Sequence, residues 1–160
     1  MELTPRGTRG AEMPNMARPL MKTMMGFSVA LYRLFGSHMR VQGRPLLLLT
    51  TVGARTGRRR RTVLGWFPDA PDESDTWLVV ASAAGSASHP SWYFNLARNP
   101  DQVWIRLGRR EVKVRPESLK GAEREGAWRR VESLAPGYGV YQEKTDRQIP
   151  IVRLRAERAS

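Results

Sequence analysis

The chain has 160 residues, so we expect one domain with a terminal extension rather than two full domains. It carries 27 Lys and Arg against 15 Asp and Glu, a formal net charge of +12, which predicts an anionic partner: nucleic acid, an acidic membrane face or a phosphorylated small molecule. The absence of cysteine excludes disulfides and thiolate chemistry, and two histidines in different segments do not predict a metal site. The start of the sequence lacks the order of a signal peptide, so we expect cytoplasmic residence.

The first 42 residues divide into two predicted segments. Residues 1–15 contain several glycines and prolines and no periodic apolar pattern, which predicts a disordered lead. Within residues 16–42, apolar side chains recur at three-to-four spacing from Met16 to Met39, with Arg and Lys at the margins. This second segment is therefore predicted to be an amphipathic helix.

The predicted helix is too short in its uncharged part to cross a membrane. Only the ten residues from Thr23 to Tyr32 lie free of charge between Lys22 and Arg33, whereas a span needs roughly 20. A helix rich in Met and edged by Arg and Lys can cover a hydrophobic surface of its own domain or lie in a membrane interface. We expect docking on its own domain, and peripheral contact of residues 16–39 with the inner face of the cell membrane stays open.

Residues 43–156 predict one domain dominated by strands. Short segments rich in Val, Leu, Ile, Thr and Trp alternate with turns rich in Gly, Pro and Asp. The predicted strands are 45–51, 62–67, 77–82, 102–107, 111–115 and 149–154, and the predicted helices are 88–98, capped by Ser88, and 117–134. Most links are too short for crossover helices, so the fold class is mainly β (α+β): a small closed or half-closed barrel of about six mostly antiparallel strands with short flanking helices.

The stretch GARTGRRRRT, from Gly53 to Thr62, places five arginines within seven positions directly after an apolar run. Guanidinium groups match phosphate and carboxylate oxygens, and Gly53 and Gly57 let the backbone turn tightly and bring N–H groups near an anion. The block predicts a phosphate cradle, but not a P-loop, because Gly-Lys-Ser/Thr is absent and a strand follows. A solvated hairpin and a single-stranded nucleic-acid surface stay open as alternatives, although the tryptophans fall in apolar patterns typical of core residues.

Two further stretches have patterns typical of ligand sites. After the strand that ends at Ser82, a loop of Gly, Ala and Ser leads into a helix, and such small side chains let a flat ligand lie against the backbone. Ser82 has no histidine or carboxylate at a spacing that would make it a nucleophile. Tyr138 and Tyr141 share one face if their turn is helical, and phenols can donate a hydrogen bond or a proton to an oxyanion. An ordinary connection and tyrosines at the edge of the core are the structural alternatives.

These three stretches, in this order, resemble the deazaflavin-dependent nitroreductase and quinone reductase family. The resemblance covers most of the chain, from about Gly43 to Leu154, and rests on LLLTTVGARTG followed by Arg60, on VAS followed by Gly85 and HPSWYFNLARNP, and on a Tyr-x-x-Tyr-Gln motif followed by TDRQIP. It implies a split β-barrel of the flavin-binding superfamily that holds reduced coenzyme F-420, a deazaflavin with a phosphate and a polyglutamate tail. It also implies hydride transfer to a quinone, a nitroimidazole or a similar electrophile, with no side-chain nucleophile.

The resemblance assigns residues to two parts of the site. The cofactor residues that it implies are Arg55, Thr56, Gly57, Arg58 and Arg60 for the phosphate and tail, and Ala81, Ser82, Ala83, Gly85 and Trp92 for the ring. The catalytic residues that it implies are Ser82, Tyr138 and Tyr141, the two tyrosines forming the aromatic wall of the acceptor pocket. A proton for the reduced acceptor could come from Ser82, Tyr141 or water, and no metal is implied.

The chain departs from the family pattern at two positions. Ala135 and Gly65 stand where some members have aromatic residues, which implies a wider pocket and favours quinones over nitro compounds. Related barrels bind FMN, haem or lipids, so FMN as the cofactor and a non-catalytic binding module stay open as alternatives. The natural acceptor, and the choice between a monomer and a homodimer, are not predicted.

Overall fold

The computed structural model describes residues 1–12, 18–36, 38–41 and 43–158. The helices in this part of the chain are α1 (Arg18–Phe35), α2 (Ser91–Arg98), α3 (Gly121–Leu134) and α4 (Gly137–Lys144), with a short 3-10 turn, η1, at Ala83–Gly85. The strands are β1 (Arg40–Val41), β2 (Arg44–Val52), β3 (Arg59–Gly65), β4 (Phe67–Pro68), β5 (Thr76–Val80), β6 (Trp104–Leu107), β7 (Arg110–Ser118) and β8 (Ile151–Ala156).

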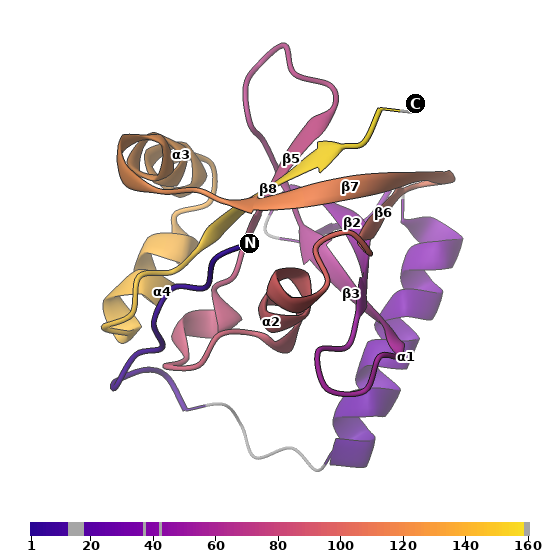
Figure 1. The fold of residues 1–160 in the computed structure, drawn as a ribbon, viewed down its shortest axis with the longest axis horizontal. Coiled ribbons are helices and arrows are strands. Elements are labelled where there is room, and N and C mark those ends of the chain that lie inside the picture. Colours follow the sequence, from indigo (N-terminus) through magenta and orange to yellow (C-terminus); the bar gives the residue numbers. More distant parts are fainter. Residues whose placement is uncertain (13–17, 37, 42, 159–160) are drawn as a thin grey trace.

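The strands form one curled antiparallel sheet. Its order is β1-β2-β6-β7-β8-β5-β4, and β3 pairs with β2 beside this path. The first part of β7 pairs with β6 and its second part with β8, so one long strand belongs to both halves of a half-barrel (Figure 1). The predicted fold class is confirmed, and the described strands of four or more residues number six, because β1 and β4 contain only two residues each.

The apolar run of β2 is buried on both faces. Leu47 and Leu49 belong to the core inside the barrel, which α2 closes. Leu46 and Leu48 point the other way and pack against Tyr32 of α1. Successive side chains of a strand face opposite sides, so a strand covered by helices on both sides has a continuous apolar sequence.

A second core cluster lies outside the barrel, between its sheet and the last two helices. Leu78 of β5 and Ile151 of β8 pack there against Trp128 and Val131 of α3, and the tyrosines of α4 border the cluster. Figure 1 shows α3 and α4 together on one side of the sheet and α1 on the other. The half-barrel is thus held between helices on two sides.

The amphipathic helix α1 docks on its own domain through Tyr32. The Tyr32 hydroxyl donates to the Arg106 carbonyl at 2.6 Å and accepts from the Gly108 N–H at 3.3 Å. The helix ends at Phe35 rather than at the predicted Met39, and residues 40–41 form β1 instead. Residues 16 and 17 of the predicted helix lie outside the described residues.

Residues 1–12, here called the N-terminal strap, lie against the domain and differ from the predicted disordered lead. The Asp146 carboxylate accepts hydrogen bonds from the Thr8 N–H at 2.8 Å and the Arg9 N–H at 2.9 Å. The hydrogen bond that the Thr8 hydroxyl donates to the same carboxylate, together with these two, holds the pKa of Asp146 at about 2, below its ordinary value. Residues 13–15 of the predicted lead lie outside the described part.

Glycine brings the strap close to the loop before α2. The Ala11 N–H donates to the Gly85 carbonyl at 2.9 Å. A Cβ on Gly10 would lie 2.1 Å from the Ala87 nitrogen, so only glycine fits there. The composition of the strap gave no sign of this order, because its partners lie far away along the chain.

Several predicted boundaries are wrong by a few residues. β3 starts three residues before its predicted start, and Gly65 ends it. β7 continues to Ser118, because Glu117 pairs opposite Arg153 of β8, so α3 starts at Gly121 rather than at residue 117. Ser88 is not the cap of α2, since Pro90 occupies that position without a side-chain cap bond.

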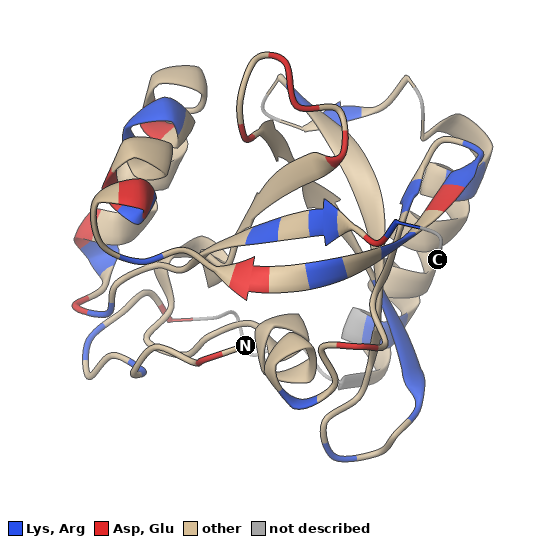
Figure 2. Cartoon of the chain, turned by 45° about the horizontal axis from the view of Figure 1, so that its top comes forward, with Lys and Arg blue, Asp and Glu red and all other residues tan. Residues whose placement is uncertain are grey.

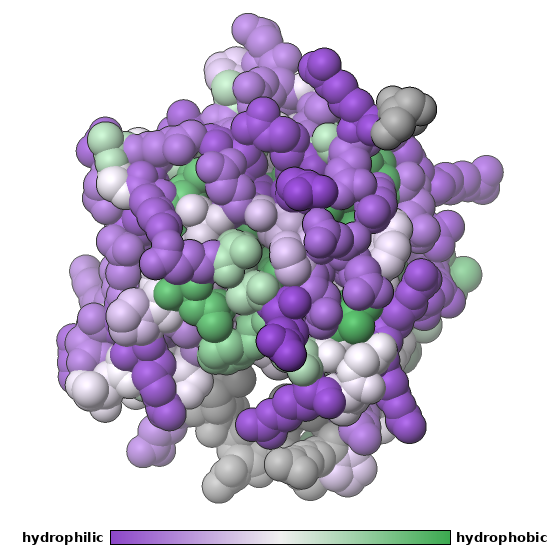
Figure 3. Space-filling view, in the orientation of Figure 1, coloured by the Kyte–Doolittle hydropathy of each residue, from purple (hydrophilic) through white to green (hydrophobic). Residues whose placement is uncertain are grey.

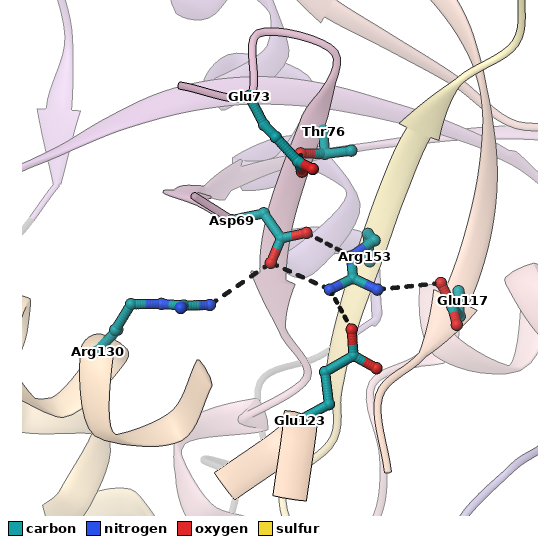
Figure 4. A network of polar contacts seen from close by, with 7 residues as sticks. All are labelled: Asp69, Glu73, Thr76, Glu117, Glu123, Arg130 and Arg153. Carbon is teal, nitrogen blue, oxygen red and sulfur yellow. Dashed lines mark hydrogen bonds and ion pairs between the residues drawn. The ribbon is translucent and has the colours of Figure 1, made fainter. Parts of the chain in front are cut away.

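An ion-pair network ties the loop after β4 to β8 and α3 (Figure 4). Asp69 and Arg153 are both buried, and the Arg153 Nη2 donates to Asp69 at 3.2 Å and to Glu123 at 2.6 Å. Two further ion pairs complete the network. The Arg153 Nη1 lies 3.3 Å from the Glu117 Oε2, and the Arg130 Nη2 lies 3.5 Å from the Asp69 Oδ1. These bonds raise the pKa of the Arg153 guanidinium, which stays charged.

The surface reflects the excess of basic residues. Figure 3 shows a mostly hydrophilic face with hydrophobic residues visible only in small areas. In Figure 2, acidic residues mark the loop between β4 and β5, whereas Arg marks β3 and the loop before it. The arginines of β3 thus lie beside α1.

Candidate functional site

A groove of about 1010 Å³ runs along the free edge of β3, between α1 and α2. Its walls come from three parts of the chain. They are Lys22, Met25, Gly26 and Val29 of α1; Gly53, Ala54, Arg55, Thr56, Arg59, Arg60, Arg61 and Thr62 of the arginine block; and His89, Ser91, Trp92, Phe94 and Asn95 at α2.

The loop between β2 and β3 is closed by its own backbone and held by α2. The Gly53 N–H donates to the Arg58 carbonyl at 2.8 Å, and Gly57 adopts a φ of +64°, which favours glycine. The Asn95 side chain accepts from the Ala54 N–H at 2.9 Å and donates to the Thr51 hydroxyl at 3.1 Å. Arg55 and Thr56 are thus fixed at the rim of the groove.

The arginines of β3 alternate around the strand edge. Arg60 pairs opposite Thr51 and therefore faces the barrel side, whereas Arg59 and Arg61 face the side covered by α1. The Arg59 guanidinium lies 4.6 Å from the centroid of the Trp104 ring. All three line the groove, because the groove wraps around the free edge of β3.

The arginine block has no counter-charge within the described part of the chain. None of the ion pairs there includes Arg55 or the arginines at 58–61, whereas the buried Arg153 contacts three carboxylates. A smaller hollow of about 390 Å³ beside Glu117 and Glu123 has acidic walls and does not suit an anion. The groove along β3 is therefore the surface fitted for an anionic ligand.

The groove also offers apolar walls for a flat group. Trp92 is buried beneath it, and Met25, Val29 and Phe94 complete its apolar part. A ligand with a planar ring and an anionic tail fits such a mixed lining, and coenzyme F-420 combines both. Among the described residues, no group of three or more His, Asp or Glu side chains could hold a metal ion.

The small-residue loop after β5 forms a left-handed turn next to the groove. Ala83, Ala84 and Gly85 have φ values of 44°, 52° and 80°. A Cβ on Gly85 would lie 2.6 Å from the Tyr141 carbonyl oxygen, so the loop lies directly against α4. The predicted ring residues Ala81, Ser82, Ala83 and Gly85 do not themselves line the groove, although Trp92 does.

His89 links this loop to the groove. The His89 Nε2 lies 2.8 Å from the Thr4 carbonyl and its Nδ1 lies 3.2 Å from the Arg147 Nη1. Since Nδ1 accepts from a cation, Nε2 carries the proton and donates to Thr4. Burial lowers the pKa of His89, so its imidazole is neutral at neutral pH.

Tyr138 and Tyr141 share a face of α4, as helical spacing requires. Their ring centroids lie 5.7 Å apart, and the Tyr138 ring lies 5.6 Å from Phe67. Burial raises the pKa of Tyr138, so its hydroxyl keeps its proton at neutral pH. The structure does not bring these tyrosines into the groove with the arginines, and their catalytic role stays a prediction.

Sequence reasoning did not identify two sets of site residues. For α1 the sequence predicts docking or membrane contact, and it does not indicate that Lys22 and Met25 form a wall of the groove. His89 and Arg147 lie within the sequence motifs, but the motifs do not indicate a role for them at the site. Helical periodicity indicated that α1 has an apolar face, but only the tertiary structure shows what that face covers.

Comparisons with known proteins agree with this geometry. The family model described as F-420H(2)-dependent quinone reductase matches residues 25–156. An F-420H(2)-dependent quinone reductase of Mycobacterium tuberculosis is 39% identical over 113 residues, which cover 69% of this chain and 72% of that protein.

Two solved structures are similar to the chain over most of its length. One, titled as an F-420-H2 dependent reductase (FDR-A), has a TM-score of 0.61 and 37% identity, covering 70% of this chain and 95% of that one. The other, titled as a domain-swapped dimer, has a TM-score of 0.62 and 33% identity, and the match covers 86% of this chain and 99% of that one. These matches confirm the resemblance drawn from the sequence motifs: the chain belongs to the F-420H(2)-dependent quinone reductase family.

Proposed function

We propose that the chain reduces a quinone-like small molecule, with reduced coenzyme F-420 as the hydride donor. Its family makes the chain an F-420-dependent oxidoreductase, and coenzyme F-420 is the cofactor of that family. The acceptor class is the proposed part. The observation that carries the F-420 part of the proposal is the groove along β3, where arginines that form no ion pairs with other described residues lie beside the buried Trp92.

The arginine block would bind the anionic end of the cofactor. Arg55 and Thr56 at the rim and Arg60 on the barrel side can donate to phosphate and carboxylate oxygens. Arg58 and Gly57 belong to the same closed loop. The cofactor, when bound, supplies the hydride, so the chain needs no nucleophile of its own.

The rest of the site would orient the ring and exclude water. Trp92 gives an apolar wall, and Arg147 connects the Ser82 carbonyl to the His89 ring at the groove. A proton for the reduced acceptor can come from Ser82, from Tyr141 or from water. Gly65 and Ala135, which stand where some family members have aromatic residues, do not line the groove, and Ala135 is buried in the core cluster beside α3, so the preference for a quinone rests on the family description alone.

Oxidation of reduced F-420 by menadione tests the proposal directly. We expect the protein to accelerate this reaction, with a rate that saturates in both substrates. The same assay with a nitroimidazole in place of menadione compares the two acceptor classes, and we expect the quinone to react faster. A menadione rate no higher than that without protein would refute the proposal.

We further propose that the protein resides in the cytoplasm and contacts the inner face of the cell membrane through α1. Phe27, Leu34 and Phe35 are 67%, 76% and 56% exposed, and the same helix carries the basic residues Lys22 and Arg33. No helix in the described residues is long and apolar enough to cross a membrane. Such a helix can lie in the headgroup region, where quinones dissolved in the membrane are within reach.

Flotation with vesicles containing anionic lipids tests this contact. The full chain should float with the vesicles, whereas the variant Phe27→Ser/Leu34→Ser should float much less. The matched control is Leu134→Ser, which changes an exposed leucine at the end of α3 instead. Equal flotation of all three proteins would remove the membrane proposal without affecting the enzymatic one.

A further inference from the structure

Arg147 is buried, and all the hydrogen bonds of its guanidinium go to one loop. Its Nε donates to the Ser86 carbonyl at 2.7 Å, and its Nη2 donates to the Ser82 carbonyl at 2.7 Å and the Ala81 carbonyl at 3.1 Å. Its Nη1 donates to the Ala81 carbonyl at 3.1 Å and to His89 at 3.2 Å. Every acceptor therefore lies between residues 81 and 89.

Burying the charged guanidinium of Arg147 costs free energy, which indicates that this position needs an arginine. Arg147 is only 3% exposed and takes part in none of the ion pairs among the described residues. Burial lowers the pKa of its guanidinium, although an arginine remains charged. Among the described residues, carbonyl dipoles and a neutral imidazole are the groups that compensate the charge.

The bonds from Arg147 enclose a strained turn. They hold Ala81 and Ser82 before the turn and Ser86 after it, while Ala83 and Ala84 between them adopt φ values of 44° and 52°. Left-handed backbone is unfavourable for alanine and persists only where the surroundings enforce it. Arg147 supplies that enforcement from both ends of the turn.

We propose that Arg147 is a positioning residue, which holds the turn from Ser82 to Ser86 and the His89 ring in the form required for hydride transfer. The inference rests on the proposed function in one respect, that the cofactor ring meets this turn. Arg147 does not line the groove, so it acts through the loop rather than on the ligand.

The variant Arg147→Lys separates geometry from charge. Lysine keeps the positive charge but donates from a single nitrogen, so it cannot reach both ends of the turn and His89 at once. The matched control is Arg124→Lys. Arg124 is also buried, at 5% exposed, and donates to the Ile149 carbonyl at 2.7 Å, away from the turn.

Hydrogen exchange without any cofactor tests the structural half of the proposal. The Gly85 and Ser86 N–H groups donate to the Ser82 and Ala83 carbonyls within the turn. In Arg147→Lys these two amides should exchange about tenfold faster or more, while the amides of β2 keep the wild-type rate. Unchanged exchange of both amides, or an equal rise in Arg124→Lys, would overturn the proposal.

Single-turnover kinetics tests the functional half. At saturating reduced F-420, hydride transfer to menadione should be about tenfold slower or more in Arg147→Lys, because a misplaced ring reacts slowly. The dissociation constant of the cofactor should change by less than about threefold, since the arginine block provides the anion contacts. A weaker affinity with an unchanged rate at saturation would contradict a positioning role.

A second substitution keeps the test decisive if Arg147→Lys folds poorly. Ala84→Gly removes the cost of the left-handed backbone, so the double variant should regain a large part of the folded fraction and of the rate. A double variant no better than Arg147→Lys alone would show that Arg147 has only a general packing role. If the wild type does not oxidise reduced F-420, the proposed function fails, while hydrogen exchange still decides whether Arg147 holds the turn.

Discussion

Three sets of arginines in the described chain lie in contrasting environments. The arginines from 55 to 61 are exposed and lack ion pairs with other described residues, Arg153 is buried among carboxylates, and Arg147 is buried among carbonyl groups. The arginines from 55 to 61 can attract an anion, Arg153 stabilises the fold, and Arg147 shapes a loop. Residue type alone predicts the anion-binding role, because a dense cluster of cations is visible in the sequence.

Arg60 should contribute directly to cofactor affinity. Removing a charged hydrogen-bond donor on the barrel side of β3 should weaken F-420 binding by about 1.5 to 3 kcal/mol, at least about tenfold in the dissociation constant. Fluorescence titration of the Arg60→Ala variant measures this. Arg109→Ala removes the same charge from the exposed turn after β6 and should bind like the wild type. Equal losses in both variants would indicate only a diffuse effect of net charge.

His89 should make folding stability depend on pH below neutrality. Burial lowers its pKa from the ordinary 6.5, so the unfolded chain binds a proton that the folded chain does not. The free energy of unfolding should therefore fall as the pH drops from about 7 to about 5. Urea denaturation at several pH values should show a shallower dependence of the free energy of unfolding on pH for His89→Asn than for the wild type. The same dependence in both proteins would contradict this assignment.

At the level of elements, the sequence predicts best where a periodic pattern has a local cause. The apolar run of β2 and the three-to-four spacing of α1 both appear in the structure close to their predicted positions. β7 extends beyond its predicted end because Glu117 pairs with Arg153 of the neighbouring strand β8. A local sequence pattern cannot show such a contact between distant residues. α4 begins in a stretch of Gly and Pro that are poor helix formers, and packing against α3 compensates for this.

The N-terminal strap should detach when its close contact is removed. In Gly10→Ala the added Cβ would meet the Ala87 backbone at 2.1 Å, so the strap must move away. Trypsin should then cleave after Arg6 and Arg9 faster than in the wild type. The matched control is Gly126→Ala in α3, where the nearest atom would lie 4.0 Å away, and its cleavage should stay slow. Slow cleavage of Gly10→Ala would show that the strap tolerates the change.

In the whole molecule, antiparallel pairing brings the distant motifs together. The arginine block and the start of α2 line one groove, and Arg147 and His89 connect the turn after β5 to it. The density of arginines in the sequence predicts the anion-binding block, whereas the residues for the cofactor ring are implied by the family resemblance. The sequence could not show that α1 forms a wall of the groove or that the tyrosines of α4 lie outside it.

The buried pair of Asp69 and Arg153 should support the stability of the whole domain. Asp69→Asn leaves the Arg153 charge less compensated in a buried position and should lower the free energy of unfolding by about 3 kcal/mol. Asp75→Asn is the matched control, because Asp75 is exposed and its distance to Arg110 is 4.0 Å. Denaturation in urea measures both, and a loss below about 1 kcal/mol for Asp69→Asn would contradict a structural network there.

We propose that the groove along β3 holds a deazaflavin in preference to other anions. Titration of the purified protein with reduced F-420, FMN and a short single-stranded oligonucleotide tests this most directly. We expect saturable binding of reduced F-420 at micromolar protein, with FMN and the oligonucleotide binding much more weakly. Binding of the oligonucleotide or FMN at least as tight as that of reduced F-420 would contradict the account.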